Sequence, residues 1–255
     1  MSTAEKSENT SLIERLSSAG AHYGYARSRR HPSMRSALFG TKNQTDIIDL
    51  EKTCAYLNRA REFVEECARQ NKTILFVGTK PEAKAAVQKA AETARQPFMV
   101  AKWVGGTLTN FSEIRKRVNR LIELEEQKER GELSVYTRQE QRELQEEMDE
   151  IRDVFGGIVH MDRLPDAILI IDPEYEDIAH QEARKLNIPE IALANSDCDI
   201  SGIAYPVPAN DASRPAIELF ADTLAEAYKK ESEARAEERE KAEAQAANNE
   251  EPTEA

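Results

Sequence analysis

The chain has 255 residues and a net charge of −12, with 40% hydrophobic and 32% charged residues. No apolar run approaches the roughly 20 residues of a membrane-spanning helix, and the polar start lacks the apolar core of a secretion signal, so we expect a cytoplasmic protein. Three cysteines without CxxC spacing argue against a disulfide framework or a zinc cluster, and no metal or cofactor is expected.

The charge is distributed unevenly along the chain. The segment from Arg15 to Thr45 contains no Asp or Glu, and neither does the window from Thr93 to Ser112. Residues 231–255, in contrast, hold nine Glu against three Lys or Arg, and predict a helical start followed by an acidic disordered tail. Salt screens distant charges within about 8–10 Å, so a local basic segment can bind phosphates whatever the net charge.

The N-terminal segment is the first candidate for function. Residues 1–10 are polar and predict a disordered N-terminus. The acid-free segment that follows mixes its cations with Tyr23, Tyr25, His31 and Phe39. Arginine forks pair with phosphates, and aromatic rings and His can stack on exposed bases, so this pattern indicates RNA binding, with a solvated loop as the alternative.

Residues 11–111 and 156–230 predict a single sheet domain. Helical spacing in DLEKTCAYLNRAREFVEECARQN, which Asp46 or Asp49 can cap, precedes a buried strand, TILFVG. A helix in TKPEAKAAVQKAAETA, which Thr79 can cap, leads to a second strand, FMVAKWV. After the interruption come the strands DAILIID, EIALA and AYPVP, the helix YEDIAHQEARKLN, and a last helix from about Pro215 to Tyr228.

Buried strands that alternate with amphipathic helices favour parallel pairing. The expected fold is therefore α/β, with a doubly wound, mostly parallel sheet of about five strands in flavodoxin-like order. AYPVP is expected at an edge, because proline is poorly tolerated inside a sheet.

Residues 112–155 interrupt this pattern with a predicted antiparallel coiled-coil hairpin. Each half has one narrow apolar stripe, Gly131 stops the first helix, and Thr137 with Glu140 forms a capping-box pattern that starts the second. The stretch WVGGTLTNF joins the sheet to this insertion as a structural hinge. Its glycines permit a sharp turn, and Asn110, Thr109 or Ser112 can cap the first helix. The expected hinge residues are Trp103, Gly105, Gly106 and Asn110.

An alternative function is a cytosolic nucleotide-binding or flavodoxin-like enzyme that uses the carboxyl ends of the strands. Its site would consist of Gly78, Thr79, Lys80 and Asp172, since ILFVGTKPEAK places a glycine and a lysine after a buried strand. Both G-x-x-x-x-G-K-[ST] and G-x-G-x-x-G are absent, however, and Asp172 also suits capping of the next helix.

Several motifs in a fixed order resemble one known family. LSSAGAHYGYARSRRHPSMRSALFG, ILFVGTK, KWVGGTLTNF and LPDAILIIDP are similar to the bacterial family of small ribosomal subunit protein two, from about Leu12 to Tyr228. The chain departs from the family pattern near Tyr25, Val159, Asn195 and Ser196. The glycines, the tryptophan and the strand framework match it.

The resemblance implies a parallel α/β domain with an inserted coiled-coil hairpin and no catalytic activity. It implies a structural protein of the small ribosomal subunit that binds small-subunit ribosomal RNA, contacts neighbouring proteins of the subunit and helps recruit the messenger-binding protein one. The acidic tail is expected to be dispensable for assembly.

Together with the acid-free segments, the resemblance leads to the hypothesis of a ribosomal RNA-binding protein that is not an enzyme. The cations expected to contact one RNA region are Arg27, Arg29, Arg30, Arg35 and Lys42. Those expected to line the base of the hairpin against another region are Lys102, Arg115, Lys116, Arg117 and Arg120.

Overall fold

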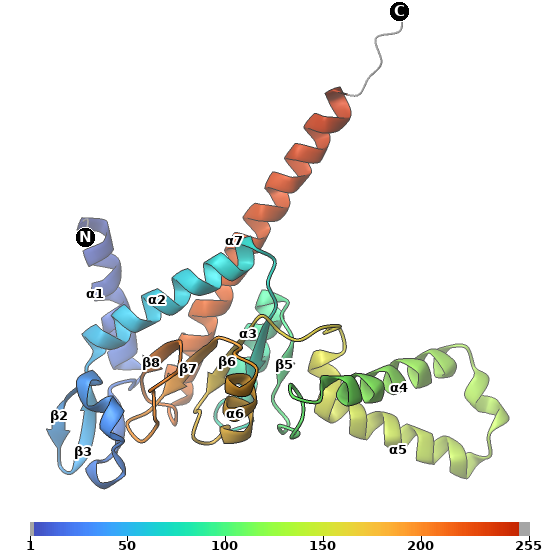
Figure 1. Cartoon of the computed structure of the whole chain (residues 1–255), viewed down its shortest axis with the longest axis horizontal. Helices are drawn as coiled ribbons and strands as arrows, with labels where there is room; N and C mark the ends of the chain where they lie inside the picture. The colour runs from blue at the N-terminus through green and yellow to red at the C-terminus, as the bar shows by residue number, and fades with distance from the viewer. Residues whose placement is uncertain (1–2, 250–255) are drawn as a thin grey trace, which may run out of the picture.

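The computed structural model describes residues 3–249, which form three parts (Figure 1). The N-terminal part consists of α1 (Thr3–Ser18), β1 (Tyr23–Ala26), η1 (Arg27–Arg29), η2 (Pro32–Ala37), β2 (Leu38–Lys42) and β3 (Thr45–Ile48). The central sheet and its helices are α2 (Leu50–Arg69), β4 (Ile74–Val77), α3 (Lys84–Ala94), β5 (Phe98–Met99), β6 (Ala167–Ile171), α6 (Asp177–Lys185), β7 (Glu190–Ala194), β8 (Tyr205–Pro208) and α7 (Arg214–Asn249). Between β5 and β6 lie α4 (Phe111–Glu129), η3 (Glu132–Val135), α5 (Arg138–Phe155) and η4 (Gly156–Ile158).

The central sheet confirms the predicted fold class. Its five strands are all parallel and follow the order β5-β4-β6-β7-β8. When only these strands are numbered, the order is 2-1-3-4-5, which is the flavodoxin-like order. The proline-containing β8 lies at one edge, as predicted. At the other edge, β5 has only two residues, because the chain leaves the sheet after Met99 rather than continuing through FMVAKWV.

Alternate residues of the buried strands face two separate hydrophobic clusters. Ile74 and Phe76 of β4 pack on one side with α2, α3 and α7. Leu75 and Val77 pack on the other side with α6 and the base of the hairpin. Because side chains alternate along a strand, a run that is apolar at every position is buried on both faces. The hairpin is therefore rooted in one of the two core layers.

The N-terminal segment folds into a second, antiparallel sheet of order β1-β3-β2, which the sequence analysis did not predict. Asn43 and Gln44 connect β2 to β3 with positive φ angles of 49° and 61°. Two consecutive residues in this region make a tight hairpin turn that matches the twist of its strands, and Asn tolerates the conformation better than most residues. The segment is thus a folded element and not a loop.

The inserted hairpin has the predicted construction. Gly131 follows α4 with a φ of 73°, and the capping box of Thr137 and Glu140 begins α5. Leu121, Leu124 and Met148 are buried between the two helices. The hairpin projects from the side of the sheet, as Figure 1 shows.

The helices at the two ends differ from the sequence predictions. Helix α1 begins at Thr3, within residues 1–10, for which the sequence predicts disorder. Helix α7 continues to Asn249, through most of residues 231–255, and residues 250–255 lie outside the described part. Ala, Glu, Lys and Arg favour helix, and spacings such as that of Glu237 and Lys241, 3.6 Å apart, support it. Among the described residues, no helix has the length and apolarity of a membrane span.

Candidate nucleic-acid interface

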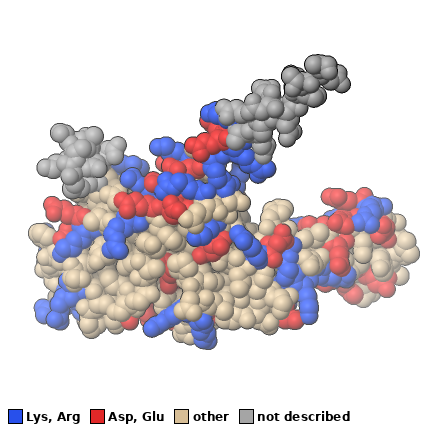
Figure 2. All heavy atoms as spheres, turned by 45° about the horizontal axis from the view of Figure 1, so that its top comes forward, with Lys and Arg blue, Asp and Glu red and all other residues tan. Residues whose placement is uncertain are grey.

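Three cations of the basic segment lie exposed on the N-terminal sheet. Lys42 ends β2, and Arg27 lies beside the β2–β3 turn, because Lys42 and Ala26 both pair with Thr45. Arg35 lies in η2, directly before β2. Within residues 3–249 none of these three cations forms an ion pair, so each is available to a phosphate. Figure 2 shows Lys and Arg side chains at this end of the molecule and at the base of the hairpin.

The other two arginines of the segment are engaged by carboxylates of the protein itself. Arg30 donates from Nε to the buried Asp46, 2.6 Å away, and also contacts Thr41. The hydrogen bond from Arg30 holds the pKa of Asp46 below its ordinary value. Arg29 pairs with Asp197 at 2.7 Å and lies over the ring of Tyr25 at 4.3 Å. Arg30 therefore stabilises the small sheet, whereas the more exposed Arg29 can still reach solvent.

The small sheet is attached to the central sheet through Ser196. The backbone N–H of Tyr25 donates to Ser196 Oγ at 2.8 Å, and the N–H of His31 donates to the Ser196 carbonyl at 2.9 Å. A Cβ atom on Gly24 would lie 2.9 Å from Ser196 Oγ, so this close approach needs glycine. Two positions that depart from the family pattern, Tyr25 and Ser196, thus contact each other directly.

The hinge wraps around a carboxylate that the sequence analysis did not single out. Glu182 of α6 is buried and accepts hydrogen bonds from the backbone N–H groups of Gly106 at 2.6 Å, Leu108 at 2.9 Å and Thr109 at 3.0 Å. The indole N–H of Trp103 is 3.3 Å from the same carboxylate. Burial opposes ionisation, but the donors outweigh it and lower the pKa of Glu182. The backbone N–H groups of the loop therefore bind the carboxylate of Glu182 and not an external phosphate.

The expected hinge residues have different parts in this loop. Gly106 requires glycine because its φ is +93°. Gly105 has neither a positive φ nor a close neighbour. Trp103 follows β5 by several residues and packs partly buried against the second core cluster, so the prediction of a strand that reaches Trp103, over FMVAKWV, was wrong. Asn110 occupies the N-cap position of α4 but its side chain makes no capping bond, which corrects the predicted role.

The cations at the base of the hairpin also divide into engaged and free side chains. Arg115 donates to the carbonyl of Val159 at 2.7 Å and pairs with Asp162 at 2.6 Å, so it fastens α4 to the chain that follows α5. A groove of about 360 Å³ lies between side chains of α4 and α5. Its walls are formed by Glu113, Lys116, Arg117, Arg120, Glu147 and Ile151.

In this groove, Lys116 pairs with Glu113 at 2.7 Å and Arg120 pairs with Glu147 at 3.2 Å. The remaining candidates, Arg117 and Lys102, are exposed and unpaired among the described residues. The base of the hairpin therefore offers fewer free cations than its sequence implies.

The site of the alternative enzyme hypothesis is filled by the protein's own charges. Lys80 Nζ lies 2.9 Å from both Asp172 and Asp211, and the Thr79 N–H donates to Glu176 at 2.5 Å. Burial and the neighbouring Asp172 raise the pKa of Asp211. No His, Cys, Asp and Glu cluster in the described part is arranged to hold a metal ion. The two carboxylates already neutralise the ammonium group of Lys80, so it is not available to a nucleotide phosphate.

Three details of this region correct or refine the sequence interpretation. A Cβ on Gly78 would lie 2.7 Å from the side chain of Val87, so this glycine serves helix packing. Asp172 accepts from the Tyr175 N–H at 3.1 Å and does not cap α6, which begins later. Thr79 does not cap α3 either, since that helix starts at Lys84.

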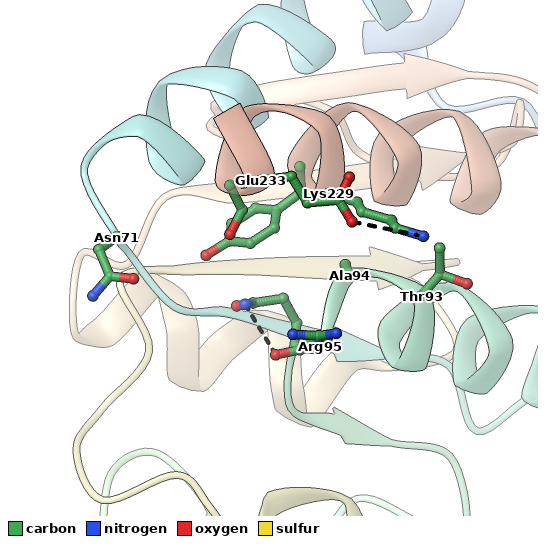
Figure 3. A pocket seen from close by; sticks show the side chains of 9 residues that line it. Asn71, Thr93, Ala94, Arg95, Lys229 and Glu233 are labelled. Atoms are coloured by element: carbon green, nitrogen blue, oxygen red, sulfur yellow. Dashed lines mark hydrogen bonds and ion pairs between the residues drawn. The ribbon is translucent and has the colours of Figure 1, made fainter. Parts of the chain in front are cut away.

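A further hollow with cationic side chains lies at the other end of the strands of the central sheet, where β4 and β5 begin. Figure 3 shows Arg95, from the end of α3, and Lys229, from α7, on its walls, with Glu233 beside Lys229 at 3.9 Å. The hollow measures about 200 Å³. Arg95 and Lys229 lie far apart in the sequence, so no local pattern indicates this hollow.

The chain has close relatives among known proteins. Residues 16–231 match the family model described as Ribosomal protein S2. Small ribosomal subunit protein uS2 of Roseiflexus castenholzii is 42% identical over 212 residues, which cover 83% of this chain and 81% of that protein. The uS2 protein of Chloroflexus aggregans is 41% identical over 215 residues, covering 84% of this chain and 90% of that protein. With both sheets and the hairpin inside the matched range, the chain belongs to the ribosomal protein S2 family of the small ribosomal subunit.

Proposed function

We propose that this chain binds small-subunit ribosomal RNA through the exposed cations of its N-terminal sheet, with a second contact at the base of the hairpin. The observation that carries the proposal is the set of Arg27, Arg35 and Lys42, which are exposed and unpaired within residues 3–249 of a chain whose net charge is −12. Free cations on a folded element can neutralise phosphates without losing an existing ion pair.

The coarser function follows from family membership. The chain is a structural protein of the small ribosomal subunit, acts in translation and is not an enzyme. The engagement of Lys80 by two carboxylates agrees with this, so the alternative of a nucleotide-dependent enzyme is set aside.

The proposal also includes protein neighbours. We infer from the family resemblance that the chain contacts other small-subunit proteins, helps dock the messenger-binding protein one and works in the cytoplasm, where ribosomes assemble. This part can be tested by comparing the proteins that sediment with small subunits in the presence and absence of the chain. Unchanged levels of protein one would contradict the docking role.

The RNA contact predicts a specific change in salt dependence. Replacing Arg27 and Arg35 together with Ala should weaken binding to small-subunit ribosomal RNA and reduce the slope of log K against log salt by about 1.4–1.8, because each phosphate contact that is removed takes away about 0.7–0.9. Fluorescence anisotropy over a range of salt concentrations measures this slope.

The matched control replaces Arg184 and Lys185, two exposed cations of α6, with Ala. This variant removes the same charge outside the N-terminal sheet, so its slope should stay unchanged. An equal effect of both variants would mean that net charge, and not the N-terminal sheet, governs binding.

A further inference from the structure

Phe39 is the most exposed aromatic side chain among the described residues, at 81% of its full exposure. It lies in β2, an edge strand of the N-terminal sheet. Single exposed apolar residues are common on protein surfaces and need no special explanation by themselves. Two further features distinguish this side chain, namely the backbone at Phe39 and the cations before and after it in the chain.

The backbone directs Phe39 outward through an irregular pairing of β2 with β3. Leu38 pairs with Ile48, but Gly40 pairs with Ile47, so one extra residue, Phe39, lies between them on β2. Such a bulge turns a side chain to a new direction and commonly occurs at functional edges. Met34 is buried and Leu38 is half-buried, whereas Phe39 is left in solvent.

The charges around Phe39 are positive. Arg35 precedes β2, Lys42 ends it, and both are exposed and unpaired in the described part of the chain. The two carboxylates that follow β2 in the chain are engaged, because Asp46 is buried against Arg30 and Asp49 caps α2 and pairs with Lys52 at 3.2 Å. An aromatic ring between free cations matches one nucleotide, whose base has a flat face and whose phosphate has a negative charge.

We propose that Phe39 stacks on an unpaired RNA base while Arg35 and Lys42 hold the adjoining phosphates. This inference rests on the proposed function and specifies its substrate as an unpaired or bulged nucleotide. In a duplex the base faces are covered by neighbouring base pairs, so a protruding phenyl ring has nothing to stack on.

Addition of a protein strand to β2 is the less favourable alternative for this edge. The bulge at Phe39 breaks the regular row of N–H and C=O groups, and Lys42 places a charge at the end of the strand. Bulges and lysines are features that prevent edge strands from pairing with other chains. The edge is therefore suited to side-chain recognition.

The test measures binding of the full chain to three fluorescein-labelled RNAs, which are an unstructured single strand, a continuous duplex and the same duplex with one bulged nucleotide. Phe39→Ala should bind the single strand and the bulged duplex about 5- to 150-fold more weakly, as expected for the loss of one stacked base. Its affinity for the continuous duplex and its salt slope should both stay unchanged, because no charge is removed.

Two controls accompany this variant. Phe39→Trp keeps a flat ring and should restore binding. Tyr175→Ala removes another aromatic side chain, which lies between β6 and α6 and is 56% exposed. This variant should have no effect on RNA binding. Circular dichroism verifies that each variant is folded.

The outcomes separate this inference from the proposed function. If Phe39→Ala binds all three RNAs like the unaltered chain while the double variant of Arg27 and Arg35 still flattens the salt slope, the stacking role is wrong and the phosphate contacts stand. An equal loss on the continuous duplex also overturns stacking. If the unaltered chain binds neither these three RNAs nor full-length small-subunit ribosomal RNA, the proposed function itself fails.

Discussion

At the scale of single residues, the protein's own carboxylates determine which cationic side chains remain available to a partner. Arg30 and Arg115 belong to the two predicted RNA-binding sets, yet Asp46 and Asp162 engage them within the protein. A carboxylate that already neutralises an arginine competes with any phosphate. The remaining exposed arginines and lysines are the ones expected to give binding its salt dependence.

Replacing Glu182 with Gln should lower the free energy of unfolding by about 2–4 kcal/mol. The backbone donors of the hinge would lose a charged acceptor, and the amide group of Gln would face one of them with its own N–H. Urea denaturation measures the change. Glu174→Gln, at an exposed position just before α6, is the matched control and should cost less than about 0.5 kcal/mol. A small effect at Glu182 would mean that water replaces the carboxylate.

His180 should make stability depend on pH. Its Nδ1 lies 2.6 Å from the buried Glu190, and this hydrogen bond raises the pKa of His180 above its ordinary value. A folded pKa above the unfolded value of about 6.5 means that the stabilisation is complete below pH about 6.5 and is lost as pH rises through the folded pKa.

Urea denaturation of the unaltered chain and of His180→Gln, at a series of pH values on both sides of the unfolded pKa, tests this. The stability difference between the two proteins should shrink with rising pH. A constant difference would indicate a packing role without titration.

At the scale of elements, the sequence was informative wherever a local pattern determined the structure. The strands β4, β6 and β7, the capping box of α5 and the stop at Gly131 follow from apolar runs and specific side chains that a reader can recognise. The N-terminal sheet was missed because its strands are short and its key contacts, such as that of Tyr25 with Ser196, join residues far apart in the chain. The same reason hid Glu182, which is one of many glutamates in the sequence.

Removal of residues 231–255 should hardly affect folding. In this part of α7, the ion pair of Glu231 with Arg69 at 3.2 Å and the hydrogen bond of Arg235 to Asn71 at 2.7 Å are both exposed. Exposed pairs contribute about 0–1 kcal/mol each. A chain ending at Lys230 should therefore unfold within about 2 kcal/mol of the full chain in urea and still sediment with small subunits.

A chain ending at Leu224 provides the contrast, because it also lacks Tyr228, which is buried and donates to the Lys72 carbonyl at 2.8 Å. This shorter chain should be strongly destabilised. Failure of the chain ending at Lys230 to enter subunits would give the acidic segment a role in assembly.

At the scale of the whole molecule, the acidic and basic side chains are unevenly distributed over the surface, although the net charge is negative. Figure 2 shows basic side chains at the end formed by the N-terminal segment and at the base of the hairpin, while acidic side chains are prominent farther along the hairpin. A chain with a charge of −12 can approach a polyanion only in orientations that present its basic regions. In the proposed RNA contact, the acidic regions would therefore help to orient the protein.

The hinge around Glu182 has a consequence for the strength of assembly. Because the loop is already held by a buried carboxylate, the hairpin keeps a defined direction relative to the sheet before any partner arrives. A rigid arm loses little conformational entropy when it is captured, so more of the interaction energy remains as affinity. Folding of the free chain thus completes an ordering step that a flexible joint would leave to the growing ribosomal subunit.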